Sequence, residues 1–489
     1  MFKVIHGKIE NYSDVSTFVK NIQKNELVAV DFFNNENPIF VTRAPGRLDI
    51  MGGMADYSGA TVFEETTEES IICALQTRKD TGFQVRSFGR GQNDFDLKGN
   101  FTLDDLLSGG QVLPYEKIRD KFSNGKEDHW LAFPAGAFAA IMHEKKHLFK
   151  VGANILLLST VPMGQGVGSS AALEISLLKA IVEAFKIPAS HRDIPYIAHV
   201  LENRIVDSPC GMMDQYASSH GVEGHILPIV CQPDTVLDPV PVKEDITIVG
   251  VDTGITSNLP KDKYAEVRTA AFMGYRIIAD KLGLKVNNLK GKPIVEIDDP
   301  YFDGYLANIR TSRFDADFRN MIPYEMSGSD FIKQYKGITD KIVTIQPDKT
   351  YEIRVACQNQ VYENLRTVLF LQLLRAYVDN HNEQLLISLG ELMFLSHRSY
   401  RQCGLANKNI TELVREIRIA GPRVGLYGAK ITGSGTRSVV AILLKKTAMP
   451  TLKNLLQEFS KKKKVKHHIY AGNSPGAIEF DHLEMKWFD

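Results

Sequence analysis

The residue types best suited to chemistry gather in one stretch near the start of the chain, from Arg43 to Tyr57. This stretch combines two arginines, two aspartates, three glycines and one proline. Arginine presents a rigid fork of donors that matches phosphates and carboxylates, an aspartate can accept two hydroxyl groups, and glycine lets the backbone approach a ligand closely. The mixture indicates a site for a polyol beside a phosphate. The alternative is an ordinary Pro-Gly turn between two strands.

A glycine-rich loop, Pro162–Ala172, lies between a predicted strand at 151–161 and a predicted helix at 169–186. Backbone N–H groups in such a loop, aimed along the N-terminus of a helix, form an anion site. Ser169 and Ser170 can cap the helix or offer a hydroxyl to a phosphate or Mg²⁺. The spacing G-x-G-x-G differs from the dinucleotide fingerprint and lacks the Gly-Lys-Ser/Thr of the usual nucleoside-triphosphatase loop. We expect this loop to bind phosphate rather than to be only a capped turn.

Two carboxylates follow the loop in the sequence. Glu202 lies late on a predicted helix at 193–206, and Asp214 follows a Pro-Cys-Gly break. Phosphoryl transfer to a hydroxyl needs metal ligands and often a carboxylate near the acceptor, and these two residues could fill those roles. Taken alone, each one is better explained as a surface or capping residue. A further small-residue loop, Gly428–Gly435, leads into a predicted strand at 438–444 and could close over a ligand.

The composition argues against several classes of partner. Lys+Arg and Asp+Glu both number 58, so the formal net charge is zero and gives no basis for binding nucleic acid or an anionic membrane. The five scattered cysteines argue against a disulfide framework and favour a reducing cytoplasm. No apolar stretch has the length of a signal peptide core or a membrane span. We therefore expect a cytoplasmic protein that binds neither nucleic acid nor membrane.

A chain of 489 residues is too long for one compact core. The residue pattern changes after Cys231, where a strand-like stretch follows, and we predict one domain at 1–235 and a second at 236–489. Scattered charges and prolines at about 286–350 indicate a possible insertion. The remaining predicted elements are strands at 38–45 and 245–252, helices at 363–379 and 383–396, and a helix ending in Lys461–Lys464.

In this order, the four segments resemble the motifs of the sugar-kinase branch of the GHMP kinases, the family of galactokinase, homoserine kinase, mevalonate kinase and phosphomevalonate kinase. Arg43–Tyr57 is similar to the galactokinase signature R-A-P-G-R-x-x-x-x-G-E-H-T-D-Y, Gly164–Ala172 to the phosphate motif, and Gly428–Gly435 to the C-terminal glycine motif. Two further stretches, Met51–Gly59 and Ser474–Ala477, resemble the L-arabinokinase group of that branch.

The resemblance implies an α+β fold of two domains. The N-terminal domain would be of the ribosomal protein S5 domain 2-like type and the C-terminal domain ferredoxin-like, with the active site in the cleft between them. ATP and Mg²⁺ would be the cofactors, and a small-molecule sugar the substrate. We expect the protein to be a monomer or a weak homo-oligomer.

The resemblance also implies roles for individual residues. Asp214 and Arg47 would be catalytic, with Asp214 either a base or a group that orients the acceptor hydroxyl. Ser170 and Glu202 would hold Mg²⁺. The other implied contacts are, for the sugar, Arg47, Gly53, Asp56, Gly211, Asp214 and Tyr264, and, for ATP, Gly164, Gln165, Gly166, Val167, Gly168, Ser169, Ser170, Ala171, Gly433 and Gly435.

The implied reaction is transfer of the γ-phosphoryl group of ATP to the anomeric hydroxyl of L-arabinose, giving L-arabinose 1-phosphate and ADP. Galactokinases have Glu-His where this chain has Gly53-Met54, and in that family those side chains reach the hydroxymethyl end of galactose. L-arabinose has the ring stereochemistry of galactose without that group. The alternatives are a galactokinase acting on galactose or a related hexose, and a non-catalytic sugar sensor on the same fold.

Overall fold

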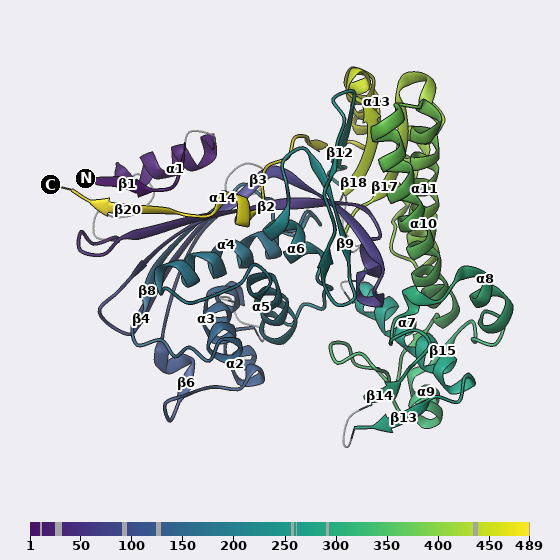
Figure 1. Cartoon of the computed structure of the whole chain (residues 1–489), viewed down its shortest axis with the longest axis horizontal. Helices are drawn as coiled ribbons and strands as arrows, with labels where there is room; N and C mark the ends of the chain where they lie inside the picture. The colour runs from purple at the N-terminus through teal and green to yellow at the C-terminus, as the bar shows by residue number, and fades with distance from the viewer. Residues whose placement is uncertain are drawn as a thin grey trace. The chain divides into compact units, whose positions relative to one another are not determined.

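The computed structural model describes residues 1–9, 12–24, 32–89, 95–123, 129–255, 259–260, 262–289, 293–433 and 439–488 (Figure 1). The chain divides into two compact units. Unit 1 comprises Met1–Arg47, Thr66–Glu223 and Asn473–Asp489, and unit 2 comprises Leu48–Glu65 and Gly224–Gly472.

This division differs from the predicted domains because two strands belong to both units. The strand β2 (Ile39–Met51) enters unit 2 after Arg47, and β3 (Thr61–Thr77) returns to unit 1 at Thr66. The prediction of two consecutive domains did not anticipate that crossing, nor the return of Asn473–Asp489 to unit 1. The early signature motif is therefore shared between the units.

Unit 1 is built on a sheet in the order β1-β20-β2-β3-β8-β4-β5, in which β4 pairs with β8 in parallel and β3 with β8 antiparallel. Besides its parts of β2 and β3, its strands are β1 (Phe2–His6), β4 (Gly82–Gly89), β5 (Phe95–Thr102), β6 (Leu107–Ser108), β7 (Gln111–Val112), β8 (Ala153–Ser159) and β20 (Leu483–Trp487). Its helices are α1 (Ser13–Gln23), α2 (Tyr115–Phe122), α3 (Ala132–Glu144), α4 (Ser169–Ala184), α5 (Asp193–Leu201), α6 (Met213–His220) and α14 (Ala477–Phe480), with short turns η2 (Leu103–Asp105), η3 (His129–Leu131) and η4 (Glu202–Val206).

The central strand β8 shows why this sheet is covered on both faces. Its sequence is an almost continuous apolar run, and Ile155, Leu156 and Leu157 are all buried. Leu156 packs in a cluster with Phe18 of α1, whereas its neighbours along the strand point to the opposite face, because successive side chains alternate. Figure 1 shows α3 and α4 against that second face. Both β8 and α4 lie inside the ranges predicted for them.

Unit 2 is built on the four-stranded sheet β17-β18-β12-β19, in which every neighbouring pair is antiparallel. Along the chain these elements run β12–α7, then β17–β18, then α13–β19, which is the βαββαβ order of a ferredoxin-like fold. The predicted α+β class with a ferredoxin-like second domain is confirmed. The strand β9 pairs separately with Thr61–Glu64 of β3.

The strands of unit 2 are β9 (His225–Val230), β10 (Thr235–Val236), β11 (Val240–Pro241), β12 (Ile246–Asp252), β13 (Lys285–Asn288), β14 (Val295–Asp298), β15 (Met326–Ser327), β16 (Thr350–Tyr351), β17 (Leu426–Ile431), β18 (Val439–Lys445) and β19 (His468–Tyr470). Its helices are α7 (Lys263–Lys281), α8 (Thr311–Arg313), α9 (Gly328–Tyr335), α10 (Ile353–Asn380), α11 (Glu383–Gln402), α12 (Lys408–Ala420) and α13 (Met449–Lys463), with short turns η1 (Gly53–Ser58), η5 (Leu306–Asn308), η6 (Phe314–Phe318), η7 (Pro422–Val424) and η8 (Lys446–Ala448).

The segment predicted as an insertion is folded and joined to the core of unit 2. Phe314 and Phe331 are fully buried in the same apolar cluster as residues of α7 and α10. Asp340 accepts hydrogen bonds from Arg268 of α7, with the Arg268 Nε to Asp340 Oδ2 distance 2.5 Å, and both side chains are buried. The segment thus fixes the side chain of Arg268 on α7 and packs into the core of unit 2.

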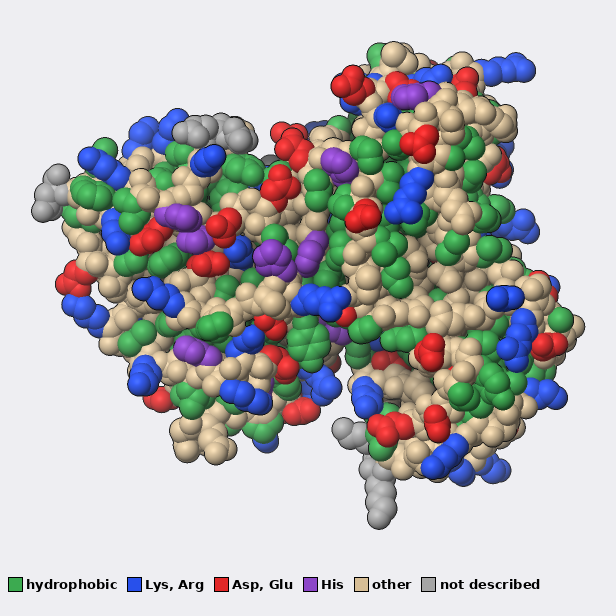
Figure 2. All heavy atoms as spheres, in the orientation of Figure 1, with side chains coloured by type: hydrophobic (Ala, Val, Ile, Leu, Met, Phe, Trp, Pro, Cys, Tyr) green, Lys and Arg blue, Asp and Glu red, His purple; other side chains and the backbone are tan. Residues whose placement is uncertain are grey.

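Basic and acidic side chains are intermingled over the face of the molecule that Figure 2 shows. The equal numbers of basic and acidic residues in the sequence are thus mixed on this face. Within the described ranges, no helix combines the length and the apolar character needed to cross a bilayer. The five cysteines are all free thiols.

The helix α11 brings a buried histidine to the central sheet of unit 2. The backbone N–H of Ile431 in β17 lies 3.4 Å from Nδ1 of His397, and only 5% of the histidine is exposed. Burial, followed by the positive charge of Lys430, lowers the pKa of His397 to about 4.

We expect acid to destabilise the protein through His397. Its pKa is about 4 in the folded state, against roughly 6.5 in an unfolded chain, so between these values only the unfolded chain binds the proton. The stabilisation is complete above pH 6.5 and lost as the pH falls through 4, by up to ~3 kcal/mol. His397→Gln should therefore lose less apparent Tm between pH 7 and pH 4.5 than wild type. Substitution of the exposed His129 by Gln should preserve the wild-type profile, and equal losses in all three proteins would contradict the assignment.

Candidate functional site

Arg47 is the centre of the polar group in unit 1. Its Nε and Nη2 donate to the two carboxylate oxygens of Asp214, at 2.8 and 2.5 Å, and its Nη1 donates to the carbonyl of Gly166 at 2.7 Å. The arginine side chain is 4% exposed and the aspartate 20%. The bidentate geometry fixes both side chains, and the remaining exposure lies on the carboxylate.

The glycine-rich loop before α4 is shaped around Arg47. The backbone N–H of Arg47 donates to the carbonyl of Val167 at 2.9 Å. Gly168 has φ +75°, and a Cβ at this position would lie 3.0 Å from Cγ of Arg47. Only glycine combines this left-handed conformation with such a close approach. The loop ends in the N-terminus of α4, where unpaired N–H groups favour an anion.

Ser170 and Glu202 come together as predicted for a metal-binding pair. Ser170 is in the first turn of α4, and its hydroxyl donates to Glu202, which begins the π-helical turn η4. Gln215 of α6 donates from Nε2 to Oε2 of Glu202 at 2.7 Å. The predicted helix at 193–206 thus changes from α to π geometry at Glu202, and π-turns inside helices are frequent at functional sites.

A second carboxylate, missed from the sequence, lies beside this pair. Glu174 is one turn after Ser170 on α4 and completely buried, and Gln215 Nε2 lies 3.4 Å from its Oε2. Burial, and then the charge of Glu202, raise the pKa of Glu174 well above its ordinary value. Burial, and then the charge of Asp214, raise the pKa of Glu202 to about 7. Three acidic groups therefore share one weakly hydrated region.

These residues fit a hard divalent cation. In the described part of the chain, Oε1 of Glu174 and Oε1 of Gln215 are buried oxygens without a hydrogen-bond partner. Mg²⁺ takes oxygen ligands, and a cation would relieve the repulsion that raises the pKa of Glu202. The chemistry of the donor set therefore agrees with the predicted Mg²⁺ ligands, Ser170 and Glu202.

The polar group in unit 2 is centred on the turn η1, which follows β2. Gly53 opens this turn with φ +42°, and the backbone N–H of Met54 donates to the Tyr400 hydroxyl at 2.7 Å. The buried Asp49 accepts from the Gly433 N–H at 3.1 Å. Two predicted ligand-binding glycines, Gly53 and Gly433, are thus connected through Tyr400 and Asp49. Gly435 lies outside the described residues.

The predicted sugar ligands Asp56 and Tyr264 also lie in unit 2, on either side of Tyr57. Asp56 is buried in η1, and its carboxylate accepts from the Tyr57 N–H at 2.6 Å. The rings of Tyr57 and Tyr264 meet edge to face at 5.9 Å, and the guanidinium of Arg268 lies 5.1 Å from the Tyr57 ring. Arg268 is itself fixed by Asp340, so the folded insertion supports this aromatic group.

The structure therefore brings the predicted residues together within each unit. In unit 1, Arg47, Asp214, the loop and the Ser170–Glu202 pair form one group, with Gly211 two residues before α6. Sequence reasoning missed Glu174, although its spacing of four from Ser170 places both on one helix face. It also missed Tyr400 and its links to η1, for which no local pattern exists.

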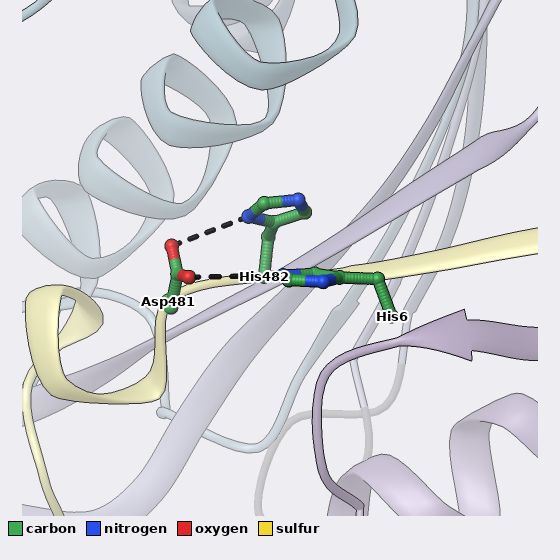
Figure 3. A group of neighbouring side chains, drawn as sticks. All are labelled: His6, Asp481 and His482. Atoms are coloured by element: carbon green, nitrogen blue, oxygen red, sulfur yellow. Dashed lines mark hydrogen bonds and ion pairs between the residues drawn. The ribbon is translucent and has the colours of Figure 1, made fainter.

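A third group, His6, Asp481 and His482, lies on unit 1 where β1 runs beside β20 (Figure 3). The three side chains could offer metal ligands, and their ligand atoms lie within 4.8 Å of one another. However, Asp481 Oδ1 already accepts from Lys179 Nζ at 2.9 Å and lies 3.2 Å from His482 Nδ1. Because a lysine cation neutralises this carboxylate, we interpret the group as a surface ion-pair cluster.

The raised pKa of Glu202 predicts a stability change with pH. Its pKa is about 7 when folded, against 4.5 for an unperturbed glutamate, so its contribution is complete below pH 4.5 and lost as the pH rises through 7. At pH 8 with a chelator, Glu202→Gln should be more stable than wild type by up to ~3 kcal/mol, because the buried charge is gone. Mg²⁺ should raise the apparent Tm of wild type and leave that of the variant almost unchanged. An equal Mg²⁺ response in both proteins would argue against Glu202 as a ligand.

Two regions of the chain match known protein families, and most of the chain is similar to sugar kinases. Residues 133–222 match the GHMP kinases N terminal domain, and residues 30–77 match the galactokinase galactose-binding signature. The chain is 29% identical to L-arabinokinase of Arabidopsis thaliana over 99% of its own length, but it spans only about half of that protein, 52%. It is 23% identical to galactokinase of Chloroflexus aggregans, covering 83% of this chain and 84% of that one.

The fold has a counterpart among solved structures. Galactokinase of Lactococcus lactis, solved in complex with galactose, superimposes with a TM-score of 0.67 at 18% identity, over 94% of this chain and 98% of that one. The two matched motif regions contain Arg47, the glycine-rich loop, Glu202 and Asp214, the residues that the geometry of unit 1 brings together. The chain thus contains regions of the GHMP kinase N-terminal and galactokinase galactose-binding types, and over most of its length it is similar to sugar kinases.

Proposed function

We propose that this protein is an ATP-dependent sugar 1-kinase that transfers the γ-phosphoryl group to the anomeric hydroxyl of L-arabinose, giving L-arabinose 1-phosphate and ADP. The observation that carries the proposal is the nearly buried Arg47–Asp214 pair, fixed against the carbonyl of Gly166 within a phosphate-type loop. It puts a cation and an acceptor-orienting carboxylate next to an anion site, the combination that phosphoryl transfer requires.

In this proposal the residues of unit 1 handle the phosphates. The N–H groups between Gly164 and Ala171 bind them at the N-terminus of α4. Arg47 neutralises charge on the transferring group, and Asp214 accepts a hydrogen bond from the acceptor hydroxyl and orients it for attack. Ser170 and Glu202 would hold Mg²⁺, which would neutralise charge on the phosphates when bound.

The residues of unit 2 bind the sugar in this proposal. The carboxylate of Asp56 accepts hydroxyl groups, and Tyr264 contributes a ring edge and a hydroxyl. Gly53 provides no side chain, and the side chain of Met54 is completely buried in the apolar cluster of unit 2. Neither residue offers a polar partner to a hydroxymethyl group, which favours a pentose with the galactose ring configuration.

The second candidate is a galactokinase. It is supported by the match of residues 30–77 to the galactose-binding signature, and by similarity to galactokinases over most of their length. A sensor without activity is less well supported, because the chain keeps the Arg47–Asp214 pair and the Ser170–Glu202 pair, and the charges of Asp214 and Arg47 act on Glu202. Substrate preference separates the first two candidates, and turnover separates both of them from the third.

The proposal predicts a preference among sugars. A buried hydroxymethyl hydroxyl left without partners costs roughly 1–3 kcal/mol, so kcat/KM should favour L-arabinose over D-galactose by about 10- to 200-fold. ADP release from a panel of sugars with Mg-ATP measures this ratio. Faster turnover of D-galactose would instead support the galactokinase, and sugar binding without any ADP release would support the sensor.

Asp214→Asn tests the catalytic role. The amide keeps the shape of the carboxylate and one acceptor for Arg47, but it cannot act as a base, so kcat measured below the unfolding transition should fall by about 10²- to 10⁴-fold. Tm should fall as well, because the buried guanidinium of Arg47 loses its countercharge. Asp193→Asn is a matched control. The Asp193 carboxylate is likewise paired with a cation, Lys145, and it accepts a hydrogen bond from the backbone N–H of Ser190, outside the proposed site. The control should keep wild-type kcat. Wild-type activity in Asp214→Asn would remove the residue from the mechanism.

A further inference from the structure

The Tyr400 hydroxyl is enclosed at the point where the signature turn η1 begins. It accepts from the backbone N–H of Met54 at 2.7 Å and donates to the carbonyl of Gly433 at 3.0 Å. The side chain is completely buried on α11, 346 residues from Met54 in the sequence. Both hydrogen-bonding capacities of the hydroxyl are used by backbone, so its position is fixed.

That hydroxyl occupies the space that a side chain at residue 53 would need. A Cβ built on Gly53 would lie 1.8 Å from Oη of Tyr400, 3.0 Å from its Cζ and 2.5 Å from Oδ2 of Asp49. The first distance is far shorter than any van der Waals contact. Every residue other than glycine at position 53 must therefore displace Tyr400.

A buried ion pair prevents such a displacement. Nζ of Lys430 donates to Oδ2 of Asp49 at 2.7 Å, and neither side chain is exposed. Asp49 also accepts from the N–H groups of Gly53 and Gly433, both at 3.1 Å, and the Lys430 ammonium lies 5.2 Å from the Tyr400 ring. Moving Tyr400 would disturb a network in which each buried polar atom depends on the others.

We propose that Tyr400 is a specificity-determining residue: by filling the side-chain position of Gly53, it keeps a polar side chain out of the signature turn and thereby selects a sugar without an exocyclic hydroxymethyl group. The inference rests on the proposed function for its substrate, whereas the steric coupling between residues 53 and 400 does not. Gly53 and Tyr400 then form a coupled pair, and neither residue alone determines the preference.

A double-mutant cycle on stability tests the coupling without any sugar. The proteins are wild type, Gly53→Ser, Tyr400→Phe and the double variant. Gly53→Ser should lower the apparent Tm strongly in wild type and much less in the Tyr400→Phe background, where the nearest ring atom is Cζ at 3.0 Å instead of Oη at 1.8 Å. The contact with Asp49 and the strain of the positive φ are the same in both backgrounds and cancel.

A matched control uses a different buried tyrosine of unit 2. The Tyr351 hydroxyl accepts a backbone N–H from Gln346 at 2.9 Å and has no contact with residue 53 in the described structure. The effects of Tyr351→Phe and Gly53→Ser should therefore add. Additive effects of Gly53→Ser and Tyr400→Phe would overturn the coupling.

A second measurement tests specificity. The kcat/KM ratio of D-galactose to L-arabinose should rise about tenfold in the Gly53→Ser/Tyr400→Phe protein relative to wild type, because a hydroxyl at position 53 can now partner the hydroxymethyl group. An unchanged ratio overturns the specificity role. Failure of the proposed function is distinguishable, because it appears in wild type as a preference for D-galactose or as no turnover, while the stability cycle is unaffected.

Discussion

The Arg47–Asp214 pair is the interaction on which the rest of unit 1's polar group depends. Arg47 comes from β2, Asp214 from α6 167 residues later, and the Gly166 carbonyl from the loop before α4. Removing one partner from a nearly buried pair leaves an uncompensated charge and typically costs about 3–5 kcal/mol of folding stability. The two residues therefore depend on each other. The left-handed glycine at 168 is one consequence, because any Cβ there would crowd the arginine.

The two arginines of the signature motif have different tasks. Arg43 is 3% exposed and donates to Asp14, the Ser474 hydroxyl and the Glu68 carbonyl, so it joins α1, β3 and the segment before α14 within unit 1. None of these three partners belongs to the glycine-rich loop or to the residues proposed to be catalytic, so we assign Arg43 a structural role. In unit 2, Asp49 likewise accepts hydrogen bonds from Lys430 and from backbone N–H groups. The composition of the signature motif suggests ligand binding, but several of its charged residues stabilise the surrounding fold instead.

The outline of the fold and the unit 1 group could be predicted from sequence because their signals are local. The apolar run of β8, the glycine spacing before α4 and the position of Glu202 late on a helix are all visible within short windows. The crossing of β2 and β3 between units could not be predicted, because nothing in a strand's own sequence says which sheet its other half joins. Nor could the contact of Tyr400 with Gly53, since it depends on how α11 packs in the folded protein.

The group around Glu202 shows how binding and stability oppose each other. Burial and then the charge of Glu202 raise the pKa of Glu174, burial and then the charge of Asp214 raise the pKa of Glu202, and Gln215 donates to only part of the acceptor surface. A sequence selected for stability alone would place apolar residues here, because burying like charges weakens the folded state. Positive charge from outside the chain would remove this cost. In the proposed Mg²⁺ site, the cost of burying these carboxylates would be the physical source of the affinity for the cation.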